Sequence, residues 1–412
     1  MLYHWKMNLT ALKFRDFRLY LFGNLFSLNA LWMQRVIIGW IAWDLTASAT
    51  FVGFIAFLNY APAVIAGPFF GVLIDRVRIK KAAKVTQFCL FVIAIGFYLF
   101  FVFGILDEIS LSALSLLSGL VTSAHHPVRL SLAPRLVNRG AVTSVVPMVA
   151  INFNLARLTG PAIGGFLIAV WGVEVALIVQ VFLYLPFIFV IGFLHPRQRE
   201  TSKTETEPFA AALYSGLQHT LANDLIRQAL AVTFLCSLLI RGTLEILPVI
   251  ADGVFAKGAT GLGLLISGAG FGALVAGTIK VFSPSQKAGE LPKFATASAL
   301  LGIAFIPLIG LSNIWALTFV YICYLGFSAT YSGISIQTAV QMDLPDSFRG
   351  RVMSIWTMIN IGASAAGAMV LGAFADYVGI SVGLSLASGI GITLFMVLLI
   401  HMPRTKKDTD DL

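Results

Sequence analysis

Long apolar stretches separated by short polar or charged segments recur along the whole 412-residue chain. Each stretch is roughly 20 residues or longer, and a helix of that length crosses a hydrocarbon core of about 30 Å at ~1.5 Å per residue. The pattern therefore predicts an all-α integral membrane protein with twelve transmembrane helices, at residues 18–43, 50–73, 82–104, 110–133, 143–169, 173–194, 226–250, 259–282, 293–311, 314–339, 350–375 and 380–402.

The twelve predicted spans divide into two equal sets around a polar segment. Residues 195–224 include the sequence RQRETSKTETEP, which is too polar to enter lipid. We expect this segment to be a cytoplasmic linker between an N-terminal six-helix half, residues 1–194, and a C-terminal half, residues 225–412, which ends in a short cytoplasmic tail. The polar N-terminus has no signal-peptide pattern, so the first span is expected to be retained.

The two halves share a sequence repeat. Pro134 with Arg139-Gly140 precedes the fifth span, and Pro345 with Arg349-Gly350 precedes the eleventh, about 210 residues later. Pseudo-symmetric halves around a midplane binding site are the arrangement expected of a secondary transporter.

Composition excludes several classes of protein. The chain is 58% hydrophobic and 11% charged, whereas a soluble domain carries about 25% charged residues. The net charge of +9 comes from basic residues in short loops, so no nucleic-acid partner is expected. The three cysteines, Cys89, Cys236 and Cys323, lack metal-ligand spacing. With no metalloprotease, nucleophile or phosphate-loop motif either, we expect neither catalytic residues, nor a metal, nor a cofactor.

The basic residues also predict the orientation. Cytoplasmic loops carry excess Lys and Arg, and with both termini inside, the 28 Lys and Arg fall at cytoplasmic ends except for Lys257, Arg35, Arg157 and Arg241. Lys257 then faces outward, and the three arginines lie within spans.

The loop between the second and third spans carries a family resemblance. Its sequence GVLIDRVRIKK, residues 71–81, resembles the cytoplasmic signature of the major facilitator superfamily, with Arg78 and Ile79 departing from the usual glycine and arginine. The resemblance covers essentially the whole chain, and implies that Gly71, Asp75 and Arg76 belong to a cytoplasmic gate.

A second motif narrows the resemblance to one branch of the superfamily. Gly160-Pro161-xx-Gly164-Gly165 resembles the fifth-span motif of antiporters, which implies gating roles for Gly160 and Pro161. Residues 45–53, 154–161 and 247–265 are similar to the branch of enterobactin-type siderophore exporters and macrolide efflux pumps. Membership of this branch implies efflux. We expect a monomer in a bacterial-type inner membrane. A multidrug or macrolide pump and a lipid or lysolipid transporter remain alternatives.

Ionised side chains inside spans are costly and usually face a cavity or a partner. Arg35, Arg157 and Arg241 are such residues, and as a set they favour an anionic or zwitterionic substrate. With the resemblance to siderophore exporters, we expect an anionic, siderophore-like small molecule. The alternatives are snorkelling for Arg35, neutralisation by Glu245 for Arg241, and a packing or gating role for Arg157, whose segment resembles the branch. The aromatic residues Tyr60, Tyr331 and Trp356 are further candidates for substrate binding, together with Trp32 and Trp40.

Proton-driven transport requires a side chain that titrates near the working pH. Glu245 is the best-placed carboxylate, and His125 and His126 in the fourth span are the other candidates for proton coupling. A structural role beside Pro127 is the alternative for the two histidines. The expected partners are thus a small-molecule substrate, protons and the lipid bilayer.

Overall fold

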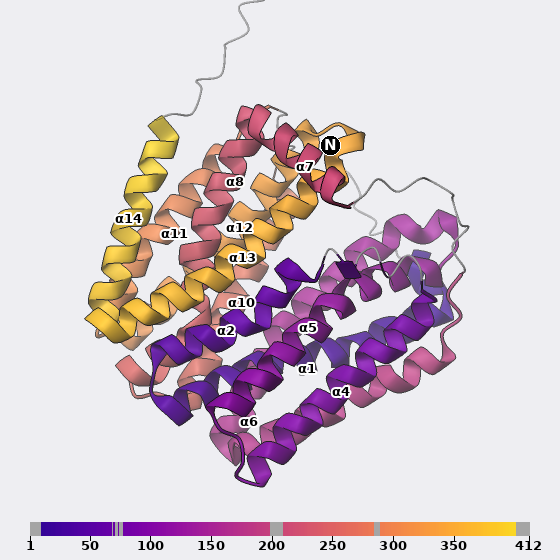
Figure 1. Ribbon diagram of the computed structural model, residues 1–412, viewed down its shortest axis with the longest axis horizontal. Helices are drawn as coiled ribbons and strands as arrows, with labels where there is room; N and C mark the ends of the chain where they lie inside the picture. Colours follow the sequence, from indigo (N-terminus) through magenta and orange to yellow (C-terminus); the bar gives the residue numbers. More distant parts are fainter. Residues whose placement is uncertain are drawn as a thin grey trace, which may run out of the picture. The chain divides into compact units, whose positions relative to one another are not determined.

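The computed structural model of the protein describes residues 10–67, 69–70, 73, 77–197, 209–283 and 289–400. This described part is helical and contains no strand (Figure 1). Its α-helices are α1 (Arg15–Thr46), α2 (Ala49–Ile65), α4 (Ile79–Val102), α5 (Glu108–Leu132), α6 (Val142–Phe193), α7 (Phe209–Ala222), α8 (Asp224–Cys236), α9 (Gly242–Glu245), α10 (Gly258–Phe282), α11 (Lys293–Leu311), α12 (Trp315–Asp343), α13 (Asp346–Val378) and α14 (Ile380–Ile400). The short 3₁₀ or π segments are η1 (Thr10–Lys13), η2 (Ala133–Leu136), η3 (Arg139–Ala141), η4 (Ser237–Arg241) and η5 (Val249–Val254).

Helices cover the described part of each of the twelve predicted spans, which confirms the all-α membrane class. Within the described residues, nine helical segments are long and apolar enough to cross a membrane. One of them, α6, covers both the fifth and the sixth predicted spans. Gly172 (φ 85°, ψ 172°) is non-helical and separates the two parts of α6 between these spans. The shorter apolar helix α2 covers most of the second span, and α5 covers the fourth.

Packing divides the chain into two compact units. Unit 1 comprises Met1–Leu45, Ala61–Lys203 and Gly258–Gly263, and unit 2 comprises Thr46–Tyr60, Thr204–Lys257 and Leu264–Leu412. Most of the predicted N-terminal half thus lies in unit 1, and most of the predicted C-terminal half in unit 2.

The core of unit 1 combines apolar packing with a buried polar layer. Gln34 of α1 donates a hydrogen bond to Ser118 of α5 (2.9 Å), and its Oε1 accepts hydrogen bonds from Gln180 (3.0 Å) and Tyr184 (3.2 Å) of α6. All four residues are buried. Because the membrane interior offers no water as a partner, such bonds between helices fix which faces pack together.

Unit 2 uses glycines where helix backbones touch. A Cβ atom added at Gly272 of α10 would overlap the carbonyl of Cys323 on α12, and one added at Gly326 of α12 would overlap the carbonyl of Ala269 on α10. Only glycine allows this distance of approach, as expected where small residues mediate helix packing in membranes.

The segment predicted as a linker contains a helix in its second half. Helix α7 packs against α13, where Ser215 accepts a hydrogen bond from Arg351 (2.7 Å) and His219 stacks on Phe348 with ring centroids 4.3 Å apart. The residues from 198 to 208 lie outside the described part of the chain.

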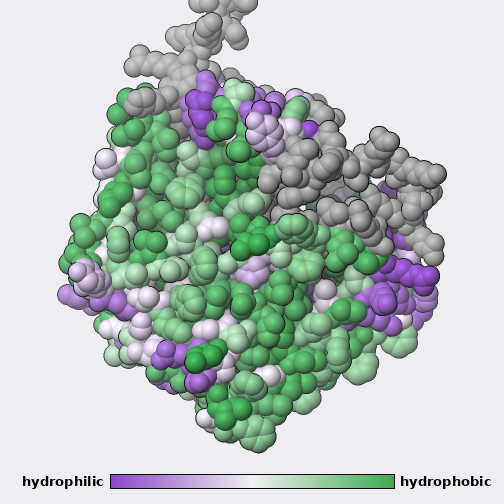
Figure 2. Space-filling view, viewed as in Figure 1, coloured by the Kyte–Doolittle hydropathy of each residue, from purple (hydrophilic) through white to green (hydrophobic). Residues whose placement is uncertain are grey.

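Large apolar side chains are exposed along the helices. Phe189 of α6 is 65% exposed and Phe271 of α10 is 60% exposed, and Figure 2 shows apolar residues over most of the visible face. In a soluble protein, apolar patches of this extent would drive aggregation. Along helices of transmembrane length they instead provide the lipid-facing surface.

Candidate functional site

Two of the arginines predicted for substrate binding lie together in unit 1, around the indole of Trp32. The guanidinium carbon of Arg35 is 4.3 Å from the Trp32 ring centroid, and that of Arg157 is 5.7 Å from it. The ring of Phe153 completes the cluster, edge-to-face with Trp32 at 5.6 Å. Each cation–π contact contributes about 0.5–2 kcal/mol, so the aromatic rings help to hold both cations in a largely apolar surrounding.

The sequence places these side chains together by helical periodicity and close packing. Trp32 and Arg35 are three residues apart on α1, and Phe153 and Arg157 are four apart on α6, so each pair shares a helix face. Helix α6 approaches α1 closely because of Gly160, whose added Cβ would lie 2.8 Å from Cβ of Trp32 and 2.9 Å from the carbonyl oxygen of Asn29.

The Trp32 cluster is rich in hydrogen-bond donors. The indole Nε1 of Trp32 is buried and has no acceptor among the described residues. Guanidinium groups are donors only, and an unmade hydrogen bond from a buried donor costs about 1–3 kcal/mol. An oxygen atom of an anionic ligand could accept the hydrogen bond of this indole N–H, and the ligand's negative charge would be attracted by the two neighbouring guanidinium groups.

The third predicted arginine lies in unit 2, beside two further candidates. The hydroxyl of Tyr60 donates a hydrogen bond to Oε1 of Glu245 (2.6 Å). Arg241 is close enough to interact electrostatically with both residues. In the described chain Glu245 thus takes its hydrogen bond from Tyr60 rather than from Arg241, although the two charged residues are four positions apart.

Irregular helical geometry surrounds this unit 2 group. Arg241 ends the π-helical turn η4, and η5 follows shortly after Glu245. Such π turns are frequent at functional sites. A Cβ added at Gly242 would lie 2.7 Å from the carbonyl carbon of Gly367 on α13, so close backbone packing supports the irregular turn.

The remaining binding and coupling candidates lie elsewhere. Tyr331 and Trp356 are buried, and Tyr331 stacks on Phe327 with centroids 5.6 Å apart. Nδ1 of the buried His125 is 3.1 Å from the hydroxyl of Thr86 on α4. His126, by contrast, is exposed, so the two adjacent histidines face different surroundings.

The predicted gating residues are only partly described. Gly71, Asp75 and Arg76 lie outside the described residues. Gly160 and Pro161 are buried in α6, where Gly160 forms the contact with α1 given above. A gating role for all five residues stays a prediction.

One buried charge was not singled out by the sequence analysis. The Lys and Arg distribution grouped Arg129 with the basic residues at the predicted cytoplasmic span ends. In the structure, Arg129 lies in the last turn of α5 and is buried, at 3% exposure. Its guanidinium carbon lies 5.3 Å from the Phe153 ring centroid. The sequence signal was present, since Arg129 lies within the apolar run 110–133, but its burial depends on α6.

In the described part of the chain, no group of three or more His, Cys, Asp or Glu side chains is arranged to hold a metal ion. Apolar helices of transmembrane length with cationic and aromatic groups between them define a polytopic membrane protein.

Comparison with known proteins identifies the family. The family described as transmembrane secretion effector matches residues 7–412, and the chain belongs to it, as a secondary transporter of the major facilitator superfamily. The resemblance stated from the sequence is thereby confirmed.

Individual proteins agree with this assignment. The chain is 27% identical over 417 residues to the enterobactin exporter EntS of Escherichia coli O127:H6, covering 96% of this chain and 94% of the relative. It is 26% identical over 410 residues to the same exporter of Shigella boydii serotype 4, with the same coverage. Its fold matches that of the nucleoside transporter NupG with a TM-score of 0.70 at 12% identity, over 94% of this chain and 98% of that one.

Proposed function

We propose that this transporter exports a small organic anion from the cytoplasm across the bacterial inner membrane, driven by proton influx, with a siderophore-like solute bearing carboxylates or phenolates as substrate. Support for export comes from the relatives, which are named enterobactin exporters and match this chain over nearly their whole length. Alternating access of the two halves is the mechanism expected of secondary transporters with this build.

The observation that carries the anionic substrate is the Trp32 cluster. It presents the guanidinium groups of Arg35 and Arg157. It also presents the buried indole N–H of Trp32, and this N–H has no acceptor among the described residues. A carboxylate or phenolate would accept a hydrogen bond from the Trp32 N–H and be attracted by both guanidinium groups, whereas a lipophilic cation would be repelled by them. Arginine binds a carboxylate through two parallel hydrogen bonds, which lysine cannot reproduce.

For proton coupling, we favour Glu245 over the two histidines. Its carboxylate is the only acid in the Arg241–Tyr60–Glu245 group, and its partner Tyr60 can donate to the ionised form and accept from the protonated form. A proton on Glu245 would also neutralise the negative charge that faces Arg241. The positive charge of Arg241 could then attract an anionic substrate, so protonation and substrate binding would be linked.

The test compares export of a catecholate siderophore with export of a lipophilic cation, from cells lacking their own exporters. We expect Arg157→Lys to reduce siderophore export about tenfold or more, because charge is kept but bidentate geometry is lost. If the protein instead exports lipophilic cations, and Arg35→Ala, Arg157→Ala and Arg241→Ala leave that export intact, the proposal of an anionic substrate is wrong.

A separate measurement tests the alternative of a lipid transporter. Transfer of phospholipid between the two leaflets of liposomes that contain the protein would support that alternative.

A further inference from the structure

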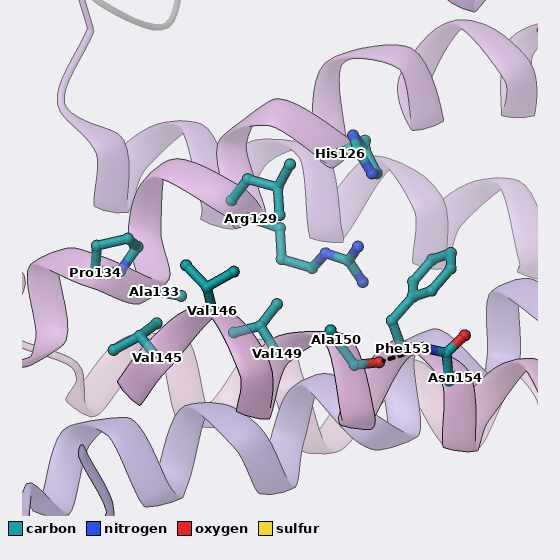
Figure 3. Close-up of a pocket in the computed structure, with 11 residues that line it drawn as sticks. His126, Arg129, Ala133, Pro134, Val145, Val146, Val149, Ala150, Phe153 and Asn154 are labelled. Atoms are coloured by element: carbon teal, nitrogen blue, oxygen red, sulfur yellow. Dashed lines mark hydrogen bonds between the residues drawn. The ribbon is translucent and has the colours of Figure 1, made fainter. Parts of the chain in front are cut away.

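Unit 1 contains a cavity of about 260 Å³ between α5 and the first part of α6. Its walls are mostly apolar, with Ala133, Val149 and Phe153 among them, and its polar residues are His126, Arg129 and Asn154. Figure 3 shows the Arg129 side chain extending from α5 into this space, towards Ala150 and Phe153 on α6. We call this cavity the Arg129 pocket.

Arg129 forms no ion pair with any of the described residues. It is 3% exposed, and its buried Nε and Nη1 atoms have no hydrogen-bond partner in the described chain. The nearby Asn154 uses its side-chain nitrogen to donate to the carbonyl of Ala150 (2.9 Å), and its Oδ1 accepts no hydrogen bond from these two Arg129 atoms. A buried charge without a partner costs several kcal/mol. The face of Phe153 offsets only about 0.5–2 kcal/mol of this.

The chain holds Arg129 in place and leaves the pocket accessible. Tyr20, which is fully buried, donates a hydrogen bond to the backbone carbonyl of Arg129 (3.2 Å). At the mouth, the lining residues Leu130 and Val146 are 47% and 66% exposed. A ligand can therefore reach the guanidinium while its apolar part rests on these side chains.

We propose that the Arg129 pocket binds the oxyanion of an amphiphilic organic anion, through charge-assisted hydrogen bonds to Nε and Nη1 of Arg129. A cavity of about 150 Å³ holds benzene, so this pocket has room for a substituted aromatic ring beside Phe153. Phe153 also contacts Trp32, which joins the pocket to the Trp32 cluster. The pocket would be a second subsite for the exported anion, and this role rests on the proposed function. The phosphate of an anionic phospholipid offers the same chemistry.

The binding test uses salicylate, which carries a carboxylate and a hydroxyl on one ring, and the purified full chain in phosphatidylcholine nanodiscs. Salicylate should raise the thermal unfolding midpoint of the wild type, because a ligand that binds only the folded state stabilises it. Neutral salicylamide should not. Arg129→Lys should weaken the apparent salicylate Kd about tenfold through loss of the bidentate geometry. The exposed Arg139 serves as control, and Arg139→Lys should leave the Kd unchanged.

Two further variants separate binding from folding. Arg129→Met should raise the unfolding midpoint without ligand, since it removes an uncompensated buried charge, and should abolish the shift by salicylate. A structural arginine would show the opposite, a lower midpoint. Ala150→Phe keeps Arg129 but fills the pocket beside it, and should abolish the shift in a folded protein.

The source of the anion is decided by changing the lipid. If salicylate stabilises the protein in phosphatidylcholine nanodiscs, and this effect requires Arg129, the pocket binds a soluble organic anion. Stabilisation by phosphatidylglycerol that requires Arg129, without an effect of salicylate, assigns it to an anionic lipid. If neither effect depends on Arg129, or if Arg129→Met lowers the midpoint, the pocket is not an anion site. That result would leave the Arg157→Lys transport test untouched, so the two proposals fail separately.

Discussion

The hydroxyl of Tyr60 donates a 2.6 Å hydrogen bond to the carboxylate of Glu245, although 185 positions separate the two residues. Tyr60 comes from α2 and Glu245 from the last turn of α9, and both belong to unit 2. The contact holds the one carboxylate of this group beside Arg241. It also makes Glu245 the first residue to test for proton coupling.

Glu245→Gln should abolish proton-driven export while leaving exchange of substrate across the membrane, because glutamine keeps the shape and the hydrogen bond but cannot carry a proton. The measurement is substrate efflux from proteoliposomes with and without a pH gradient, beside exchange of labelled for unlabelled substrate. Asp44→Asn, a change at an exposed acid, is the matched control and should behave as wild type. Gradient-driven export by Glu245→Gln would transfer the coupling role to another group, with His125 and His126 next in line.

Gly160→Ala should destabilise the protein and slow transport, because the added Cβ would meet Cβ of Trp32 at 2.8 Å. Overpacking of this kind costs about 1–3 kcal/mol, so the thermal unfolding midpoint should fall. Gly192→Ala is the control within the same helix, since its Cβ would meet nothing within 4 Å. It should be neutral or slightly stabilising, because alanine favours helix over glycine by about 1 kcal/mol. Equal midpoints for the two variants would show that α1 and α6 tolerate separation at Gly160.

Asp75→Asn should impair transport without greatly lowering the amount of protein in the membrane. Asp75 lies outside the described residues, and the reason is its place in the loop that resembles a cytoplasmic gate. A gate acts through the difference in stability between two access states, so loss of its charge changes populations rather than folding. Initial export rate per amount of membrane protein is the measurement, with Glu174→Gln at an exposed helix position as control. An unchanged rate would remove Asp75 from the mechanism.

The predicted orientation places Lys203 in the cytoplasm and Lys257 outside. In a variant without the native Cys89, Cys236 and Cys323, Lys257→Cys should react with an impermeant maleimide added to intact cells. Lys203→Cys should react only after the cells are opened. Labelling of position 203 in intact cells would overturn the orientation derived from the Lys and Arg distribution.

The sequence by itself determined the helices and the family. A membrane-spanning segment must satisfy its backbone hydrogen bonds internally, so span length and hydropathy are local properties that can be read residue by residue. For this reason the predicted ranges matched helices from α1 to α14, and the motifs at 71–81 and 160–165 indicated the correct superfamily. The break of α6 was also a local property, since Gly172 adopts a positive φ that glycine favours.

Only the tertiary structure decided which side chains meet. Charge in an apolar run singled out Arg35 and Arg157, but their shared contact with Trp32 depends on the approach of α6 to α1 at Gly160. Tyr60 and Glu245 are too distant along the chain for any periodicity to pair them. Arg129 shows the limit most clearly: a basic residue near a span end suggests a hydrated loop, and only packing of Val149 and Phe153 from α6 over α5 buries its charge. Burial and pairing are properties of the space between helices, which no single segment of sequence contains.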